Sequence, residues 1–168
     1  RTGALSLALD QKDGSGAIVG ASGIRGLLAE HIQVRAGYEA AIAAALGSLS
    51  DAVLAESRED ALRALDDVRA AEAGRVEIVI ADSAAPVIPA GLPAGVASAA
   101  ELVTGPDGIR GLLAGVVVVD DLAAARASWS AVAAIGGLTM ITREGDVLTE
   151  HVVRGGSGGG RSTIELAE

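Results

Sequence analysis

The sequence contains no cysteine and no phenylalanine, and Tyr38 and Trp129 are its only tyrosine and tryptophan. The lack of cysteine excludes a disulfide framework, a thiolate metal site and a cysteine nucleophile, and it fits a reducing cytoplasm. Because aromatic side chains are so few, the core has to be built from Ala, Val, Leu and Ile. Aromatic stacking platforms for single-stranded nucleic acid are nearly absent for the same reason.

Positive charge is also scarce. Lys12 is the only lysine among thirteen basic residues, and the formal net charge is −9. Phosphate binding depends on clustered Lys and Arg, so we expect at most a local basic patch. The longest apolar run, 111–119, is shorter than the roughly 18 residues typical of a membrane span, and no basic-then-apolar leader opens the sequence. We therefore expect a soluble, cytoplasmic protein that does not enter a membrane.

Two helices are predicted in the first half of the sequence. The first begins near Tyr38 and ends at Gly47, a residue type that commonly terminates helices. The second begins at Ser57, which has Asp60 three residues later as in a capping box, and ends by Gly74. Its apolar stripe consists of Ala61, Leu62, Leu65 and Val68.

Strands alternate with these helices. Val76–Ile80 and the β-branched run Val116–Val119 are typical of buried strands, and a helix at 122–135 follows the second, capped by Asp120 or Asp121. Two further strands, 138–142 and 147–149, flank Arg143-Glu-Gly-Asp146, a sequence typical of a hairpin turn. This order predicts an α/β fold of mixed sheets that ends in an antiparallel hairpin.

A seven-residue segment, Gly-Ile-Arg-Gly-Leu-Leu-Ala, occurs at 23–29 and again, letter for letter, 85 residues later at 108–114. Each copy is followed by a strand candidate (31–34 and 116–119), an Ala-rich helix and another strand. The repeat favours two related αβ subdomains, with coincidence in a low-diversity sequence as the alternative. A Pro-rich connector with Pro86, Pro89 and Pro93 predicts a boundary, which we place between 17–90 and 91–163.

The glycine run at 155–160, followed by Arg161 and Ser162, has P-loop spacing but carries arginine where a P-loop has lysine. Only eight residues follow it, too few for the helix that a P-loop leads into. Ser157 also sits in a G-x-S-x-G pattern, yet both histidines, His31 and His151, precede it, against the order of a hydrolase triad. Neither pattern predicts catalysis, and the two histidines have no metal-ligand spacing.

The glycines predict a backbone feature instead. A strand edge without side chains lets a second backbone approach closely, which suits a protein–protein seam. Simple loop flexibility is the alternative. Arg143, Arg154 and Arg161 lie near this end of the chain and are candidate DNA contacts.

Three segments resemble the SMC (structural maintenance of chromosomes) hinge family. The segment from Gly23 to Gly47 is similar to the hinge opening, a glycine-containing turn that leads to a "GYE-x-AI-x-AALG" motif. The segment from Leu112 to Ala125 resembles the hinge's "LLG-x-VVVVDDL-x-x-A" motif, and Glu144–Leu148 resembles its hairpin. The Arg-rich, Lys-poor style is similar to that of actinobacterial members.

The resemblance implies a homodimerisation module and not an enzyme. Residues 1–16 and 164–168 would then be the ends of two coiled-coil arms around the two subdomains, with no cofactor, metal or catalytic residue between them. The implied dimer interface consists of Gly155, Gly156, Ser157, Gly158, Gly159 and Gly160. The implied parent is a nucleoid-associated ATPase of chromosome condensation and segregation, whose distant heads hydrolyse ATP and bind a kleisin complex, with weak DNA contact at the hinge. A small nucleotide- or ligand-binding α/β enzyme is the alternative.

Overall fold

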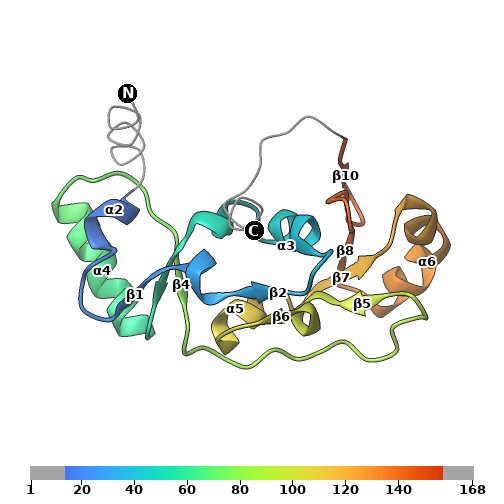
Figure 1. The fold of residues 1–168 in the computed structure, drawn as a ribbon, viewed down its shortest axis with the longest axis horizontal. Helices are drawn as coiled ribbons and strands as arrows, with labels where there is room; N and C mark the ends of the chain where they lie inside the picture. Colours follow the sequence, from blue (N-terminus) through green and yellow to red (C-terminus); the bar gives the residue numbers. More distant parts are fainter. Residues whose placement is uncertain (1–13, 157–168) are drawn as a thin grey trace.

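The computed structural model of the chain describes residues 14–156. Along these residues the same order of elements occurs twice (Figure 1). The first half contains β1 (Ile24–Leu27), a 3-10 helix (Leu28–His31), β2 (Gln33–Val34), α3 (Glu39–Leu46), β3 (Val53–Ala55), α4 (Arg58–Ala70) and β4 (Ile78–Ile80). The second half contains β5 (Ala97–Ser98), a 3-10 helix (Ala99–Leu102), β6 (Val103–Thr104), α5 (Asp107–Leu112), β7 (Val116–Val119), α6 (Leu122–Ile135) and β8 (Thr139–Thr142). The two related αβ subdomains predicted from the sequence are therefore a duplication of one topology.

Each half forms the same sheet. β1 pairs antiparallel with β3, which pairs parallel with β4, and β5, β7 and β8 repeat this arrangement. The second sheet continues beyond β8 with β9 (Val147–Leu148) and β10 (Val153–Arg154), both antiparallel, in the order β10-β9-β8-β7-β5. β2 and β6 form a separate two-stranded sheet that joins the halves. The predicted α/β class and the hairpin after β8 are both confirmed.

Matching side-chain caps begin the long helix of each half. The Ser57 hydroxyl accepts a hydrogen bond from the Asp60 backbone N–H at 3.2 Å, at the start of α4. The Asp121 carboxylate accepts one from the Ala124 N–H at 2.8 Å, at the start of α6. Each cap satisfies a backbone donor that the first turn of a helix leaves without an internal partner. Of the two aspartates that the sequence offers, Asp121 is the cap.

The two copies of the seven-residue repeat adopt different structures. Residues 23–29 form a turn, β1 and the start of the 3-10 helix, whereas 108–114 lie mostly in α5. The copies are also not equivalent in the duplication, because the counterpart of α5 is α3. Gly23 has a φ of +80°, whereas Pro106 and Asp107 precede the second copy and favour a helix start through a fixed φ and a first-turn carboxylate.

The halves exchange a helix. α3 of the first half packs against β8 of the second sheet, and α5 of the second half packs against β4 of the first sheet. The Gly108 N–H in α5 donates a hydrogen bond to the Ala81 carbonyl, just after β4, at 3.0 Å. The main core is accordingly one cluster with members from both halves, among them Leu28, Ile42 and Leu54 from the first and Ile109, Val118 and Ile141 from the second. Each half therefore completes the core of the other.

The remaining segments connect these units. α2 (Ser15–Ile18) packs against α4 through the buried side chain of Ile18, and a 3-10 helix (Gly47–Asp51) precedes β3. The connector at 81–96 has no helix or strand, as its prolines predict, and the expected boundary at residue 90 lies within it. The strand expected at 31–34 is shorter, because His31 ends a 3-10 helix and only Gln33–Val34 pairs, with β6. Within 14–156, no helix is long and apolar enough to cross a membrane.

Candidate interaction surface

The outer edge of β4 differs from that of its counterpart, β8. Both are the terminal parallel strands of their repeat units, but β8 is covered on its far side by β9, with Ile141 opposite Val147. β4 is the last strand of its sheet, with no corresponding strand among the described residues. Edge strands present unpaired N–H and C=O groups that can bind another chain. Within residues 14–156, the strand that β9 forms in the second half therefore has no counterpart in the first half.

An apolar groove lies beside this edge, between α4 and β4. Its volume is about 220 Å³. Two leucines of α4 in the groove are exposed although they belong to the apolar stripe predicted from the sequence: Leu62 is 51% and Leu65 38% exposed, whereas Ala61 and Val68 are buried. The groove is lined by Arg58, Ala61, Leu62, Leu65, Val76, Ile78 and Ile80.

Another sheet edge belongs to β10. Among residues 14–156 this strand pairs with β9 alone, with Val153 opposite Leu148 and Arg154 opposite Val147. The Val153 side chain is 75% exposed and that of Val152 is 44% exposed. An open strand edge that carries exposed valines is a surface on which a further strand can dock.

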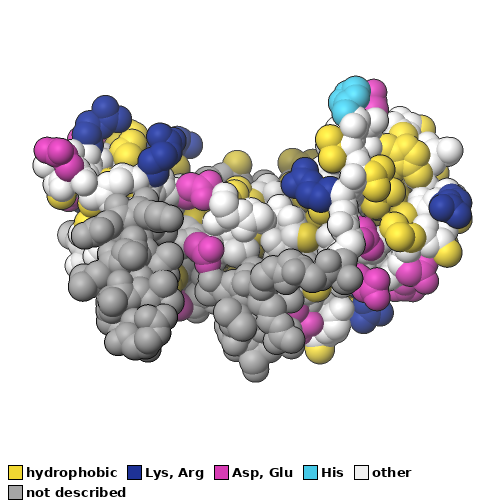
Figure 2. Space-filling view, turned by 90° about the horizontal axis from the view of Figure 1, so that it is seen from above, with side chains coloured by type: hydrophobic (Ala, Val, Ile, Leu, Met, Phe, Trp, Pro, Cys, Tyr) yellow, Lys and Arg dark blue, Asp and Glu magenta, His cyan; other side chains and the backbone are white. Residues whose placement is uncertain are grey.

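The outer edges of β4 and β10 lie in different halves and in different parts of the molecule. α4 and β4 are in the left part of Figure 1 and β10 is in the right part. Figure 2 shows apolar side chains gathered on the right-hand part of its face, over the second half. A second copy of the chain can satisfy both edges at once, because head-to-tail contacts between two copies close into a ring with two equivalent seams.

The glycines predicted to form an interface are only partly described. Ser157, Gly158, Gly159 and Gly160 lie outside the described residues, as does Arg161. Gly156 has a φ of +107° and open space where a side chain would begin. A Cβ at Gly155 would instead overlap the carboxylate of Asp146 in the same chain. Of the two described glycines, Gly156 has open space where a Cβ would lie, and Gly155 has Asp146 there.

The candidate DNA-contact arginines are in different environments. Arg143 is occupied within the chain: its guanidinium lies 4.4 Å from the centre of the Tyr38 ring, and its Nε donates to the Gly37 carbonyl at 3.4 Å. Its Nη1 is 3.6 Å from a carboxylate oxygen of Asp120. Arg154 is exposed on β10. Basic side chains are scattered over the face shown in Figure 2 and form no patch there.

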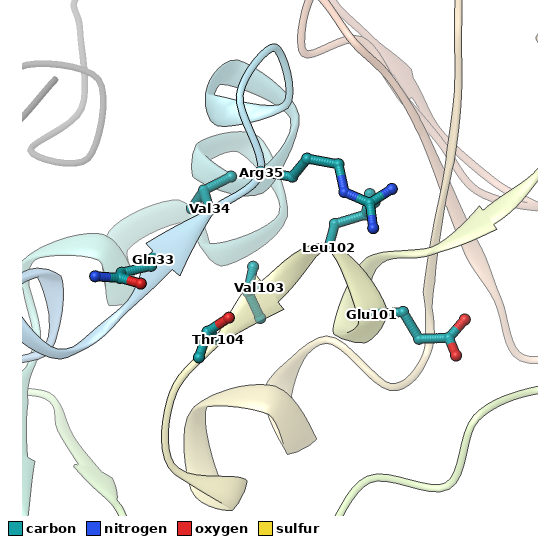
Figure 3. Close-up of a pocket in the computed structure, with 7 residues that line it drawn as sticks. All are labelled: Gln33, Val34, Arg35, Glu101, Leu102, Val103 and Thr104. Atoms are coloured by element: carbon teal, nitrogen blue, oxygen red, sulfur yellow. The ribbon is translucent and has the colours of Figure 1, made fainter.

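A second hollow, of about 330 Å³, lies where β2 meets β6 (Figure 3). A backbone hydrogen bond links the two segments here, since the Arg35 N–H donates to the Leu102 carbonyl at 2.9 Å. The charged ends of Arg35 and Glu101 and the amide of Gln33 point in different directions. These side chains do not converge on one point, as the side chains of a ligand site would. The hollow lies at the junction of the two halves. It is lined by Gln33, Val34, Arg35, Glu101, Leu102, Val103 and Thr104.

An exposed ion pair joins β1 to the segment that follows β3. Arg25 donates from Nε and Nη2 to the two carboxylate oxygens of Glu56, at 2.8 and 2.9 Å. These charge-assisted bonds lower the pKa of Glu56 and raise the pKa of Arg25. The pair stabilises the fold above the usual pKa of a glutamate and loses this effect as the pH falls through the lowered pKa of Glu56. Within the described part of the chain, no cluster of His, Asp or Glu could hold a metal ion.

Comparison with known protein sequences gives one consistent result. A family model described as the SMC proteins flexible hinge domain matches residues 21–129. The chain is 39% identical over 174 residues to the chromosome partition protein Smc of Mycolicibacterium paratuberculosis and 35% identical over 178 residues to that of Mycobacterium tuberculosis. Each alignment covers 99% of this chain but 14% of the relative, so the chain spans a small part of these proteins' length.

Solved structures with a similar fold belong to the same group. The SMC hinge domain of Geobacillus stearothermophilus, solved as an asymmetric dimer, has a TM-score of 0.69 and 26% identity, over 89% of this chain and 64% of that chain. The SMC hinge domain of Pyrococcus furiosus has a TM-score of 0.63 and 26% identity, over 86% of this chain and 80% of that chain. Sequence and fold therefore point to the family that the motifs resemble.

Proposed function

We propose that this chain, which belongs to the SMC hinge family, is the module through which two copies of a longer chromosome-partition protein join head to tail. The observation that carries this proposal is the bare outer edge of β4, beside an apolar groove, where the equivalent strand β8 is covered by β9. The hinge of Geobacillus stearothermophilus, which shares the fold, was solved as a dimer.

In the proposed dimer, β10 of one chain lies along β4 of the other. The three-stranded sheet of one copy then continues into the five-stranded sheet of its partner. Main-chain hydrogen bonds between the two edges supply affinity, as in strand addition, and apolar side chains supply specificity. Val153 of one copy enters the groove at Leu62 and Leu65 of the other, and the contact is made twice in the ring.

The direct test is the solution mass of the wild-type chain. Sedimentation equilibrium should give twice the chain mass of 16.5 kDa at micromolar concentrations. A single-chain mass at the highest soluble concentration would overturn the proposal. ATP with Mg²⁺ serves as the control for the alternative, a nucleotide-binding enzyme: bound nucleotide would raise the melting temperature, and we expect no change.

In the longer protein, the hinge joins two coiled-coil arms whose far ends carry the ATPase heads and the kleisin-binding sites. The joined arms form a V or ring that acts in chromosome condensation and segregation, in the cytoplasm at the nucleoid. These features come from the family, and this chain supplies the joint between the arms. The chain itself has no catalytic role in the proposal.

We also propose that the hinge touches DNA weakly. The net charge of −9 opposes binding, and Arg143 is held by Tyr38 and Asp120, which leaves Arg154 as the free cation among the two described candidates.

Fluorescence anisotropy with a short duplex should detect binding at low salt and almost none at physiological salt. Arg154→Ala should weaken the low-salt binding, whereas Arg69→Ala, an equal charge change on the exposed face of α4, should not. Nanomolar binding at physiological salt would contradict this prediction.

A further inference from the structure

The turn between β8 and β9 is tied together by Asp146. The Thr142 hydroxyl donates a hydrogen bond to Oδ2 of Asp146 at 2.8 Å, and the Asp146 N–H donates back to the same hydroxyl at 3.0 Å. Thr142 is fully buried. One carboxylate oxygen of Asp146 is thus fixed to the core of the second half, and the side chain has little freedom to turn away.

The other carboxylate oxygen faces the chain that leaves β10. Oδ1 of Asp146 accepts a hydrogen bond from the Gly156 N–H at 3.4 Å. A Cβ at Gly155 would overlap this carboxylate, so the backbone at Gly155 lies directly against Asp146. Gly155 is not among the glycines with positive φ. The space beside Asp146, and not the backbone torsion, is what excludes a side chain at position 155.

β10 is anchored at its start by the turn before it, where the Thr149 N–H donates to the Val152 carbonyl at 2.8 Å and the Val152 N–H donates to the Thr149 hydroxyl at 3.0 Å. The strand itself contains two residues, both exposed, which pair with β9 through Val153 and Arg154, so its far end depends on the contacts with Asp146. A strand of this length frays unless its end is fixed. Ordering a mobile strand on association costs free energy, and a strand that is already ordered avoids that cost.

We propose that Asp146 is a positioning residue for self-association, which fixes β10 and the start of the glycine run in the orientation that the partner binds. This inference rests on the proposed function, because it assumes that β10 forms the seam. Asp146 itself touches no partner atom: it acts through Thr142 on one side and through Gly155 and Gly156 on the other. The glycine at position 155 is required by the chain's own carboxylate.

The first test compares two variants of the same turn. Asp146→Ala should raise the dimer dissociation constant about tenfold or more in sedimentation experiments, and Asp146→Asn, which keeps an acceptor for Thr142, should retain part of the affinity. Glu144→Gln removes one negative charge from an exposed position two residues away and should have no effect. Hydrogen exchange should become faster at the Arg154 and Gly156 amides, but not in the buried strand β7.

The second test is a double-mutant cycle with Gly155→Ala. In the wild-type background this substitution should weaken the dimer, because the added methyl group displaces the Asp146 carboxylate. In the Asp146→Ala background it should cost much less, because the obstructing carboxylate is gone. An equal cost in both backgrounds would mean that Gly155 faces the partner, and the assignment to Asp146 would be overturned.

Failure of this inference differs from failure of the proposed function. If the wild-type chain is a monomer, the proposed function fails. If the wild type is a dimer that substitution of Val153 dissociates, while Asp146→Ala leaves both affinity and exchange unchanged, only the role of Asp146 is overturned. Urea unfolding of each variant as a monomer separates a loss of affinity from a loss of fold.

Discussion

A chain with Val153→Lys should sediment as a folded monomer at concentrations where we expect the wild type to be a dimer. Val153 is 75% exposed in the single chain, so the substitution leaves the monomer's fold intact. In the seam, the new ammonium group would have to enter an apolar groove that already contains Arg58. Placing an unpaired charge there should raise the dissociation constant by roughly a hundredfold or more.

The connector supplies a matched control for this variant. Val87 is 83% exposed, lies outside both proposed surfaces and can receive the same substitution. Val87→Lys should leave the dimer intact, whereas Leu62→Glu, on the opposite side of the seam, should dissociate it. A Val153→Lys chain that remains a dimer with an unchanged circular dichroism spectrum would show that β10 is not part of the seam.

Mixing the two monomeric variants tests whether the two surfaces meet. In a head-to-tail dimer of one Val153→Lys chain and one Leu62→Glu chain, the two introduced charges face each other in one seam, and the other seam is unaltered. The mixture should therefore recover a dimer that neither variant forms alone. If it stays monomeric, β10 and the α4–β4 groove are not partners.

A chain with Gly108→Ala should be strongly destabilised. A Cβ at this position would overlap the backbone carbonyl of Ile80 and lie 2.9 Å from the Ser83 hydroxyl oxygen. The obstacle is main chain and cannot rotate away, so either α5 must withdraw from β4 or the Gly108 N–H must give up its bond to Ala81. We expect a loss of roughly 3 kcal/mol or more in the free energy of unfolding, measured from urea unfolding curves.

The control for this prediction is a glycine with open space around it. Gly20 has no neighbouring atom within 4 Å of the position that a Cβ would take, and its φ is not positive, so Gly20→Ala should change the stability little. If Gly108→Ala unfolds at the same urea concentration as the wild type, then the close packing of α5 on β4 is not what holds the two halves together.

Local signals in the sequence determined the elements whose formation depends on nearby residues. Ser57 and Asp121 are side-chain caps that act within three residues of chain, and they mark α4 and α6 correctly. The valine run at 116–119 is a central strand because four β-branched side chains in succession fit a strand buried on both faces. The hairpin after β8 follows from Gly145, which has a φ of +100°. The motifs at 23–47, 112–125 and 144–148 together carry the resemblance to the SMC hinge family.

Sequence could not fix the contacts that depend on residues far apart in the chain. Leu62 and Leu65 belong to the apolar stripe predicted for α4, and their exposure depends on which side of α4 faces the sheet. Arg143 is predicted to contact DNA, and only the fold shows that Tyr38 and Gly37, more than a hundred residues away, lie against its guanidinium. Gly155 is predicted to lie in the dimer interface, and only the fold shows that Asp146 of the same chain occupies the position of its missing Cβ.

The repeated heptapeptide separates what local sequence determines from what tertiary packing decides. Residues 23–29 and 108–114 have identical letters and therefore identical intrinsic propensities, yet one is strand and 3-10 helix and the other is mostly helix. Pro106 and Asp107 favour a helix start in the second copy, and that much is written in the sequence. The packing of Gly108 on the backbone of β4 cannot be predicted from the local sequence, because it exists only once the two halves have exchanged α3 and α5. Tertiary packing overrides propensity at this point because a short helix gains most of its stability from the surface it covers.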